Sequence, residues 1–253
     1  MELGTIAFLT VAGFVASAVD AIAGGGGLIS LPAIVAAGVP PHMALGTNKF
    51  ANTFSSSTSS LRFALSGKLA WRLVRWQIPC TALGAALGVR SALALDERVL
   101  NALIIVMVLA VAVYSALKRD FGERDAFKGL SAGRVGFGMA FAFALGFYDG
   151  FFGPGTGSFL IFTFIRAYGF DFTVAAGNAK VLNFTSNVVS LALFALGGKI
   201  MYPAGVPMAA AMVAGAWVGA RVAIKNGARV IRPVFVLIGL ALVAKLAIET
   251  FAA

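Results

Sequence analysis

A polar motif occurs twice in this chain of 253 residues, and this repeat constrains the possible fold more than any other feature. The stretch 45–55 reads LGTNKFANTFS, and the stretch 176–186, 131 positions later, reads AGNAKVLNFTS. Identical glycine and polar residues occupy matching positions in the two copies: Gly46 and Gly177, Lys49 and Lys180, Asn52 and Asn183, Ser55 and Ser186. Chance similarity between apolar stretches would align Leu and Ala rather than Lys, Asn and Ser, so we infer an internal duplication.

The duplication extends over most of the chain. At the same offset, further residues match: Gly84 and Gly215, Gly88 and Gly219, Arg90 and Arg221. Upstream, Asp20 and the glycines after it match Asp149 and the glycines after it, at an offset of 129. The most charged stretch of the chain lies between the copies. We therefore expect an N-terminal repeat at 1–117, a charged cytoplasmic linker at 118–133 and a C-terminal repeat at 134–253.

Long apolar segments indicate that the chain lies in a lipid bilayer. With 60% hydrophobic and 12% charged residues, it has too little polar surface for a soluble protein. A helix that crosses the hydrocarbon core needs about 20 apolar residues. Hydropathy gives apolar segments at 3–22, 27–38, 43–66, 72–94, 99–117, 134–165, 171–196, 203–222 and 231–251. We expect an all-α polytopic membrane protein with about eight transmembrane or partly re-entrant helical segments in two pseudo-symmetric halves. A barrel is disfavoured because the apolar runs are unbroken.

The net charge of +10 reflects membrane topology rather than a nucleic-acid partner. Lys and Arg lie mostly between the apolar segments, and the positive-inside rule assigns such residues to the cytoplasmic side. If one glycine-broken segment in each half does not cross the membrane, three basic stretches lie on the same side of it. These stretches are near Lys68, at 118–133 and near Arg221. We therefore favour inverted halves with both termini on the outer side of the membrane. Full crossings by all segments, which would separate these stretches, are the alternative.

Two glycine clusters interrupt the apolar segments. The first reads AGGGGLISLP from Ala23, and the second reads GFFGPGTGS from Gly150. Consecutive glycines, each costing about 1 kcal/mol in a helix, and a proline break the helix. A helix that restarts after such a break directs free N–H groups towards it, which favours an anion. We expect substrate contacts at Gly25, Gly26, Gly155, Thr156 and Gly157. Close packing of helices through small residues is the structural alternative.

Lysines and amides inside the repeated motif predict an anion site. Lys49, Asn52 and Ser55 follow one another at three-residue steps and share one helix face. An ionisable side chain within a span is costly unless it faces a cavity or a partner. We expect the substrate to contact Asn48, Lys49, Asn52, Ser55, Asn178, Lys180, Asn183 and Ser186. The alternative is that each lysine extends to the membrane interface.

Asp20 and Asp149 precede the glycine clusters in apolar surroundings and are candidates for coupling. Each carboxylate could pair with a lysine or carry a coupled proton. A role in ending the helix before the glycines is the structural alternative. His42 follows Pro40 and Pro41, so we expect it in a turn between segments.

These motifs resemble a known transporter family. Asp20, three residues and four glycines, followed by LGTNKFAN, and GFYDGFFGPGTGSF, followed by AGNAKVLNFTSN, resemble the TauE/SafE family of membrane transporters, named for sulfite export. The resemblance covers essentially the whole chain. It implies a permease with two homologous halves that moves sulfite, sulfonates or sulfoacetate across a bacterial inner membrane. By motif position, the resemblance implies substrate-binding roles for Asn48, Lys49, Asn52, Asn178, Lys180, Asn183 and both glycine clusters.

The sequence thus predicts a secondary transporter that moves a small sulfur-containing anion by alternating access. Its predicted partners are this anion and membrane lipid, with no nucleic acid, cofactor or metal, and the question of a homodimer is left open. No metal-ligand or nucleophile motif is found, so an enzyme is not expected. A permease for another small anion or for a metal cation, and an anion channel, are the alternative functions.

Overall fold

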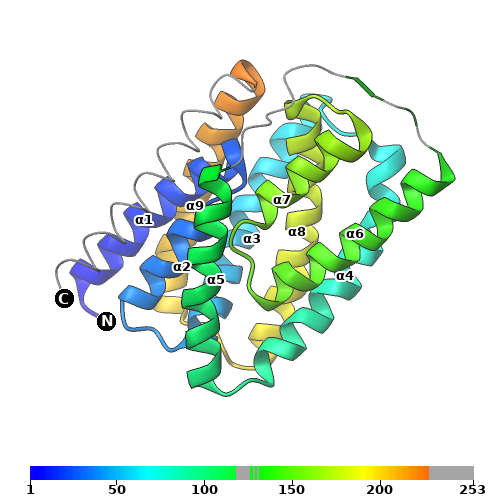
Figure 1. The fold of residues 1–253 in the computed structure, drawn as a ribbon. Coiled ribbons are helices and arrows are strands. Elements are labelled where there is room, and N and C mark those ends of the chain that lie inside the picture. The colour runs from blue at the N-terminus through cyan, green and yellow to red at the C-terminus, as the bar shows by residue number, and fades with distance from the viewer. Residues whose placement is uncertain (118–125, 128, 130, 228–253) are drawn as a thin grey trace.

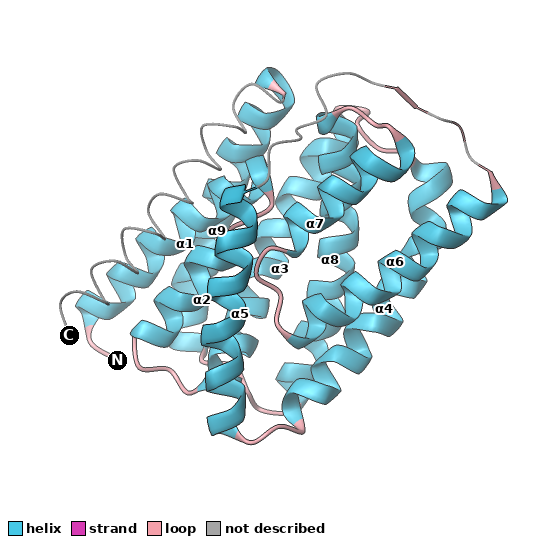
Figure 2. Ribbon diagram, in the orientation of Figure 1, coloured by secondary structure: helices cyan, strands magenta, loops and turns pink. Residues whose placement is uncertain are grey.

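The described part of the chain is all-helical, as predicted (Figure 2). The computed structural model describes residues 1–117, 126, 127, 129 and 131–227. The helices are α1 Leu3–Ala23, α2 Gly27–Ala36, α3 Pro41–Leu65, α4 Trp71–Leu93, α5 Glu97–Leu117, α6 Ala132–Phe151, α7 Thr156–Thr163 with the π-helical turn η1 Phe164–Tyr168, α8 Phe172–Leu196 and α9 Tyr202–Asn226. The predicted segment 231–251 and most of the predicted linker lie outside the described residues.

Some of the described helices meet the length and composition needed to cross a membrane. Among the described residues, α1, α8 and α9 are long and apolar enough to span a bilayer, judged by length and composition. α2 has 10 residues and is therefore about 15 Å long, half the hydrocarbon thickness of about 30 Å. Gly26, between α1 and α2, packs against the main-chain oxygen of Ala16 in α1. The chain therefore turns back sharply after α1.

Helix boundaries follow the sequence repeat. α8 begins and ends at the repeat counterparts of the first and last residues of α3, and α9 begins at the counterpart of the first residue of α4. α6 and α7 begin at the counterparts of the first residues of α1 and α2, with the shorter offset that relates Asp20 to Asp149. Glycines with positive φ recur at the same offsets: Gly24 and Gly153, Gly38 and Gly169, Gly67 and Gly198. The similarity of the two copies therefore extends from residue types to the places where helices start and turn.

The first helix of each half packs against the fourth helix of the other half (Figure 1). α1 lies along α9, and α4 lies along α6. Glycines allow this close approach. A Cβ at Gly215 or Gly219 in α9 would overlap the main-chain oxygens of Phe14 and Ala18 in α1, and Gly84 and Gly88 in α4 lie in the same way against Phe143 and Phe147 in α6. Residue numbers rise together along both members of each pair, so each pair is parallel.

α3 and α8 lie between these two pairs and run antiparallel (Figure 1). Near the start of α8, the Asn178 side chain accepts a hydrogen bond of 2.8 Å from the Ala70 N–H, which follows the end of α3. Near the start of α3, the Thr47 side chain accepts one of 2.9 Å from the Met201 N–H, which follows the end of α8. The two donors are repeat counterparts of each other, and so are the two acceptors.

One end of the helical bundle, here named the basic end, carries most of the described basic residues. It holds the ends of α3 and α9 and the starts of α4, α6 and α8. Its charged residues are Arg62, Lys68, Arg72, Arg75, Arg134, Arg166, Arg221 and Lys225, with Asp171. The opposite end carries Arg90, Arg98 and Lys199 with Glu2, Asp96 and Glu97. The basic stretches near Lys68 and Arg221 thus lie at one end, which is the arrangement that inverted halves require.

His42 lies in the first turn of α3 and not in a turn between segments, so that expectation was wrong. Proline fits the first helical position, because its missing N–H would be unpaired there in any case. Pro41 therefore begins α3 and brings His42 into the helix. The His42 ring is buried, with Nε2 3.1 Å from the Ala92 oxygen and Nδ1 3.6 Å from Glu97.

Candidate functional site

The two glycine clusters meet in the interior of the bundle. α1 ends at Ala23, and the next residue, Gly24, has a φ of 80°, the left-handed conformation that favours glycine. The Ser158 N–H donates to the Gly24 oxygen over 3.2 Å, and the Ser158 hydroxyl donates to the Ala23 oxygen over 2.9 Å. Gly24 and Gly157 pack backbone against backbone. The predicted helix breaks are therefore confirmed, and the alternative, close packing of glycines, occurs at the same place.

Two buried ion pairs join the N-terminal and C-terminal halves beside Gly24 and Gly157. We name the glycine segments around these two residues the glycine tips. Lys49 Nζ in α3 lies 2.8 Å from Asp149 Oδ1 in α6, and Lys180 Nζ in α8 lies 2.6 Å from Asp20 Oδ2 in α1. The four side chains are between 0% and 9% exposed. Both lysines are therefore enclosed by protein and do not extend to an interface. Each carboxylate pairs with a lysine, which was one of its two predicted functional roles.

Asp149 is held by three side chains. Its Oδ1 accepts from Lys49, and its Oδ2 accepts from Asn183 Nδ2 over 3.1 Å and from the Ser186 hydroxyl. An ionised carboxylate has about four lone-pair sites, so these donors nearly saturate it. Asp149 would therefore keep two hydrogen bonds if Lys49 turned to another partner.

Asp20 has a different set of partners. Lys180 Nζ donates both to its carboxylate and to its main-chain oxygen, and the Gly26 N–H lies 3.4 Å from its Oδ1. The repeat counterparts of Asn183 and Ser186 bond elsewhere. Asn52 Nδ2 donates to Asn48 Oδ1 over 2.9 Å, and the Ser55 hydroxyl lies 2.7 Å from that of Ser17. The two ion pairs are thus related by the repeat but unequal in their surroundings.

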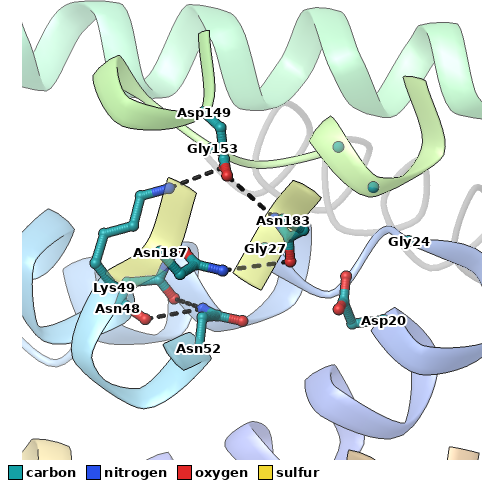
Figure 3. Close-up of a pocket in the computed structure, with 12 residues that line it drawn as sticks. Asp20, Gly24, Gly27, Asn48, Lys49, Asn52, Asp149, Gly153, Asn183 and Asn187 are labelled. Atoms are coloured by element: carbon teal, nitrogen blue, oxygen red, sulfur yellow. Dashed lines mark hydrogen bonds and ion pairs between the residues drawn. The ribbon is translucent and has the colours of Figure 1, made fainter. Parts of the chain in front are cut away.

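A small polar cavity lies between the glycine tips, α3 and α8 (Figure 3). Its lining consists of Asp20, Gly24, Gly27, Asn48, Lys49, Asn52, Asp149, Gly153, Gly155, Gly157, Asn183 and Asn187. It offers about 20 Å³ to the centre of a water molecule, which is room for about one water. An oxyanion of sulfur is larger, so its binding requires the lining elements to move apart.

The charges around the cavity balance. Two lysines and two aspartates form pairs, so the site has no excess positive charge of the kind expected from the lysines alone. Removing one partner of a buried pair leaves an unpaired charge, at a cost of about 3–5 kcal/mol. An anion that binds Lys49 therefore competes with the Asp149 carboxylate for the ammonium charge.

The cavity brings together about half of the predicted site residues. Those in its lining are Asp20, Asn48, Lys49, Asn52, Asp149, Gly155, Gly157 and Asn183. Those outside its lining are Gly25, Gly26, Ser55, Thr156, Asn178, Lys180 and Ser186. Asn178 binds the backbone before α4, and the Thr156 hydroxyl donates to the Gly153 oxygen over 2.7 Å within its own turn. Contact of these residues with substrate stays a prediction.

Sequence reasoning did not identify Asn187, which lines the cavity beside Asn183. Asn187 Nδ2 lies 3.3 Å from Asn183 Oδ1 and 3.4 Å from the Ser56 hydroxyl of α3. The four-residue step from Asn183 puts both amides on one helix face and could have revealed it. The repeat did not reveal it, because the counterpart of Asn187 in the first copy is Ser56.

Comparisons with known proteins find similar chains along nearly the whole length. The family described as Sulfite exporter TauE/SafE matches residues 9–246. The chain is 40% identical over 252 residues to a probable membrane transporter protein of Haemophilus influenzae, covering 97% of this chain and 96% of that protein. It is 38% identical to the probable membrane transporter protein ORF9 of a Sinorhizobium species, covering 95% and 92%. It is 34% identical to the probable membrane transporter protein YfcA of Escherichia coli K12, covering 96% and 89%. No solved structure matches the chain.

Proposed function

The chain belongs to the sulfite exporter TauE/SafE family of membrane transporters, and we propose that it is a secondary transporter for a small sulfur-containing anion, such as sulfite or an organosulfonate. The cavity carries this proposal, because in it Lys49 and four asparagines face the glycine tips of both halves. An ammonium group and side-chain amide N–H groups are donors that bind the oxygens of an oxyanion, as are main-chain N–H groups at helix starts.

In the proposed binding step, the anion takes the place of the Asp149 carboxylate beside Lys49. Asp149 then keeps its hydrogen bonds from Asn183 and Ser186. A proton that binds Asp149 at this point preserves the neutrality of the buried site, which avoids the cost of an added charge. The anion and a proton therefore move together, and transport is coupled to the proton gradient.

Alternating access is supported by the arrangement of the halves. The antiparallel α3 and α8, the matched hydrogen bonds at Ala70 and Met201, and the crossed packing of α1 with α9 and α4 with α6 all favour inverted repeats. The tips touch at Gly24 and Gly157, beside the cavity. In the proposed cycle, one helix pair rocks against the other and separates the tips from opposite sides in turn.

The positive-inside rule supports a cytoplasmic position for the basic end in a bacterial inner membrane. α1 runs parallel to α9, which ends at the basic end, so α1 begins at the opposite end. The N-terminus is therefore periplasmic in this proposal. The expected periplasmic C-terminus lies outside the described residues.

A cation permease is less well supported. Within 1–117 and 131–227, no group of three or more His, Cys, Asp or Glu residues is placed to hold a metal ion. Both carboxylates at the site are already paired with lysines, which would repel a cation. An open channel is also less well supported, because the cavity has room for about one water.

Flux of labelled sulfite into proteoliposomes tests the proposal. Loss of a charge-assisted hydrogen bond costs about 1.5–3 kcal/mol, so Lys49→Gln should lower flux by about ten- to a hundredfold. Lys68→Gln, a lysine of the basic end outside the cavity lining, is the control and should keep wild-type flux. Wild-type flux in Lys49→Gln would refute the role of Lys49. Absence of saturable flux of sulfite and sulfonates through the wild-type protein would refute the substrate class.

A further inference from the structure

A second hollow lies at the basic end, between the ends of α3 and α9. Its lining consists of Arg62, Leu65, Ser66, Arg221, Ile224 and Lys225, none of which lines the central cavity. It offers about 350 Å³ to the centre of a water molecule, compared with about 20 Å³ in the central cavity. The hollow can therefore hold a group much larger than a water without movement of the helices.

Three cations line this hollow, and no carboxylate of the described residues pairs with them. The Arg62 and Arg221 guanidinium carbons lie 4.9 and 5.6 Å from the ring centre of Trp217. The indole face attracts each guanidinium, and the two like charges near one ring repel each other. An anion between them would remove this repulsion, so the hollow is electrostatically complementary to an anion.

The helix faces that lead to the hollow are exposed and apolar. In α3, Leu65 follows Arg62 by three residues and is 77% exposed. In α9, Val213 and Trp217 are 38% and 44% exposed and precede Arg221 by two turns and one turn. Residues at these spacings share a face, so Arg221 continues an apolar stripe of α9 that points outward, and Arg62 has one exposed leucine beside it on α3. Such stripes, ending at an interfacial tryptophan, are typical of surfaces in contact with lipid.

The repeat does not reproduce this hollow at the other end of the bundle. The counterparts of Arg62, Trp217 and Lys225 are Leu193, Ala86 and Ala94, and only Arg221 has a basic counterpart, Arg90. The three cations and the tryptophan are therefore specific to the basic end and are not a by-product of the duplication.

We propose that this hollow binds the phosphate group of an anionic glycerophospholipid from the leaflet at the basic end. Arg62, Arg221 and Lys225 bind the phosphate, and Trp217 and Leu65 contact the glycerol and acyl chains. A free anion would use the cations but not the apolar walls and stripes, so the combination favours a lipid. The proposal does not depend on which substrate the central cavity carries.

Quenching of Trp217 fluorescence by brominated lipids tests the site. The chain has three tryptophans, so the full chain with Trp71→Phe and Trp76→Phe, both exposed positions, reports on Trp217 alone. The protein is reconstituted in phosphatidylcholine with equal mole fractions of brominated phosphatidylglycerol or brominated phosphatidylcholine. Each cation contributes roughly fivefold to the preference for an anionic lipid. The three contributions multiply, so we expect phosphatidylglycerol to associate roughly a hundredfold more tightly than phosphatidylcholine.

The variants distinguish a specific site from a general charge effect. Arg62→Gln with Arg221→Gln should lower the preference by roughly twenty-fivefold, the product of two such contributions, whereas Arg90→Gln, the counterpart of Arg221 at the other end, should retain it. If the double variant does not fold, Lys225→Gln alone should reduce the preference by roughly fivefold. Equal quenching by both lipids, or an equal loss in Arg90→Gln, would overturn the proposal. Loss of the preference on adding inorganic phosphate would assign the hollow to a free anion and would also overturn it.

Discussion

The two ion pairs contribute unequally to stability, and we predict that Lys180→Met destabilises the protein more than Lys49→Met. Loss of one partner from a buried pair costs about 3–5 kcal/mol. After Lys49→Met, Asp149 keeps its hydrogen bonds from Asn183 and Ser186, so we expect a cost of about 3 kcal/mol. After Lys180→Met, Asp20 keeps only the Gly26 N–H at 3.4 Å among its described donors, so we expect about 5 kcal/mol.

Thermal unfolding in detergent, followed by intrinsic fluorescence, measures this difference. For a chain of this size, 1 kcal/mol corresponds to about 2–4 °C in Tm. Lys180→Met should therefore lower Tm by about 10–20 °C and Lys49→Met by about 6–12 °C. Lys199→Met, in the connection after α8, is the control and should shift Tm by less than about 2 °C.

A second substitution tests the cause of the loss. Asp20→Asn removes the unpaired charge but keeps an oxygen that can accept from Gly26, so adding it to Lys180→Met should restore most of the lost stability. The reasoning fails if both lysine variants lower Tm equally, or if the double variant is less stable than Lys180→Met alone.

Two further predictions concern the tips and the topology. Gly24→Ala should abolish flux and lower Tm by several degrees. The φ of Gly24 is 80°, and the left-handed conformation alone costs alanine about 1–2 kcal/mol. The added Cβ would also overlap the backbone of Gly157. Gly4→Ala, where a Cβ meets nothing within 4 Å, is the control, and equal behaviour of both variants in flux and unfolding assays would refute the role of the tip contact. In a Cys80→Ser background, Gly67→Cys and Lys225→Cys should react with an impermeant maleimide from the same, cytoplasmic side, and Ala94→Cys from the other. Labelling of Gly67→Cys and Lys225→Cys from opposite sides would contradict inverted halves.

Local properties of the sequence predicted most of the helical architecture. Unbroken apolar runs predicted the helices, and the glycine clusters predicted where α1 and α6 end, because helix propensity and backbone freedom depend on neighbouring residues. The repeat offset predicted that α3 and α8 would match, and their boundaries do so. The failure at His42 has the same local origin, since Pro41 was assigned to a turn although proline is equally suited to the start of a helix.

The candidate site could be predicted only by residue type. Lys49, Asn52, Asn183 and the two aspartates were identified because charged and amide side chains are rare and costly in apolar segments. Asn178 is also an amide in an apolar segment, but its side chain binds the main chain before α4. Its residue type therefore did not predict its hydrogen-bond partner. Asn187 was not identified, because the repeat offset aligns it with a serine.

By itself, the sequence determined that this is a helical membrane protein, and its repeated motif predicted an internal duplication with charged residues at matching interior positions. Only the tertiary structure decided that Lys49 pairs with Asp149 and Lys180 with Asp20, so that the site has no net charge. These partners are 100 and 160 residues apart, and they meet because α1 and α6 each pack into the other half. An ion pair depends on a distance of a few ångströms, and that distance is set by how the helices pack and not by where the residues lie along the chain.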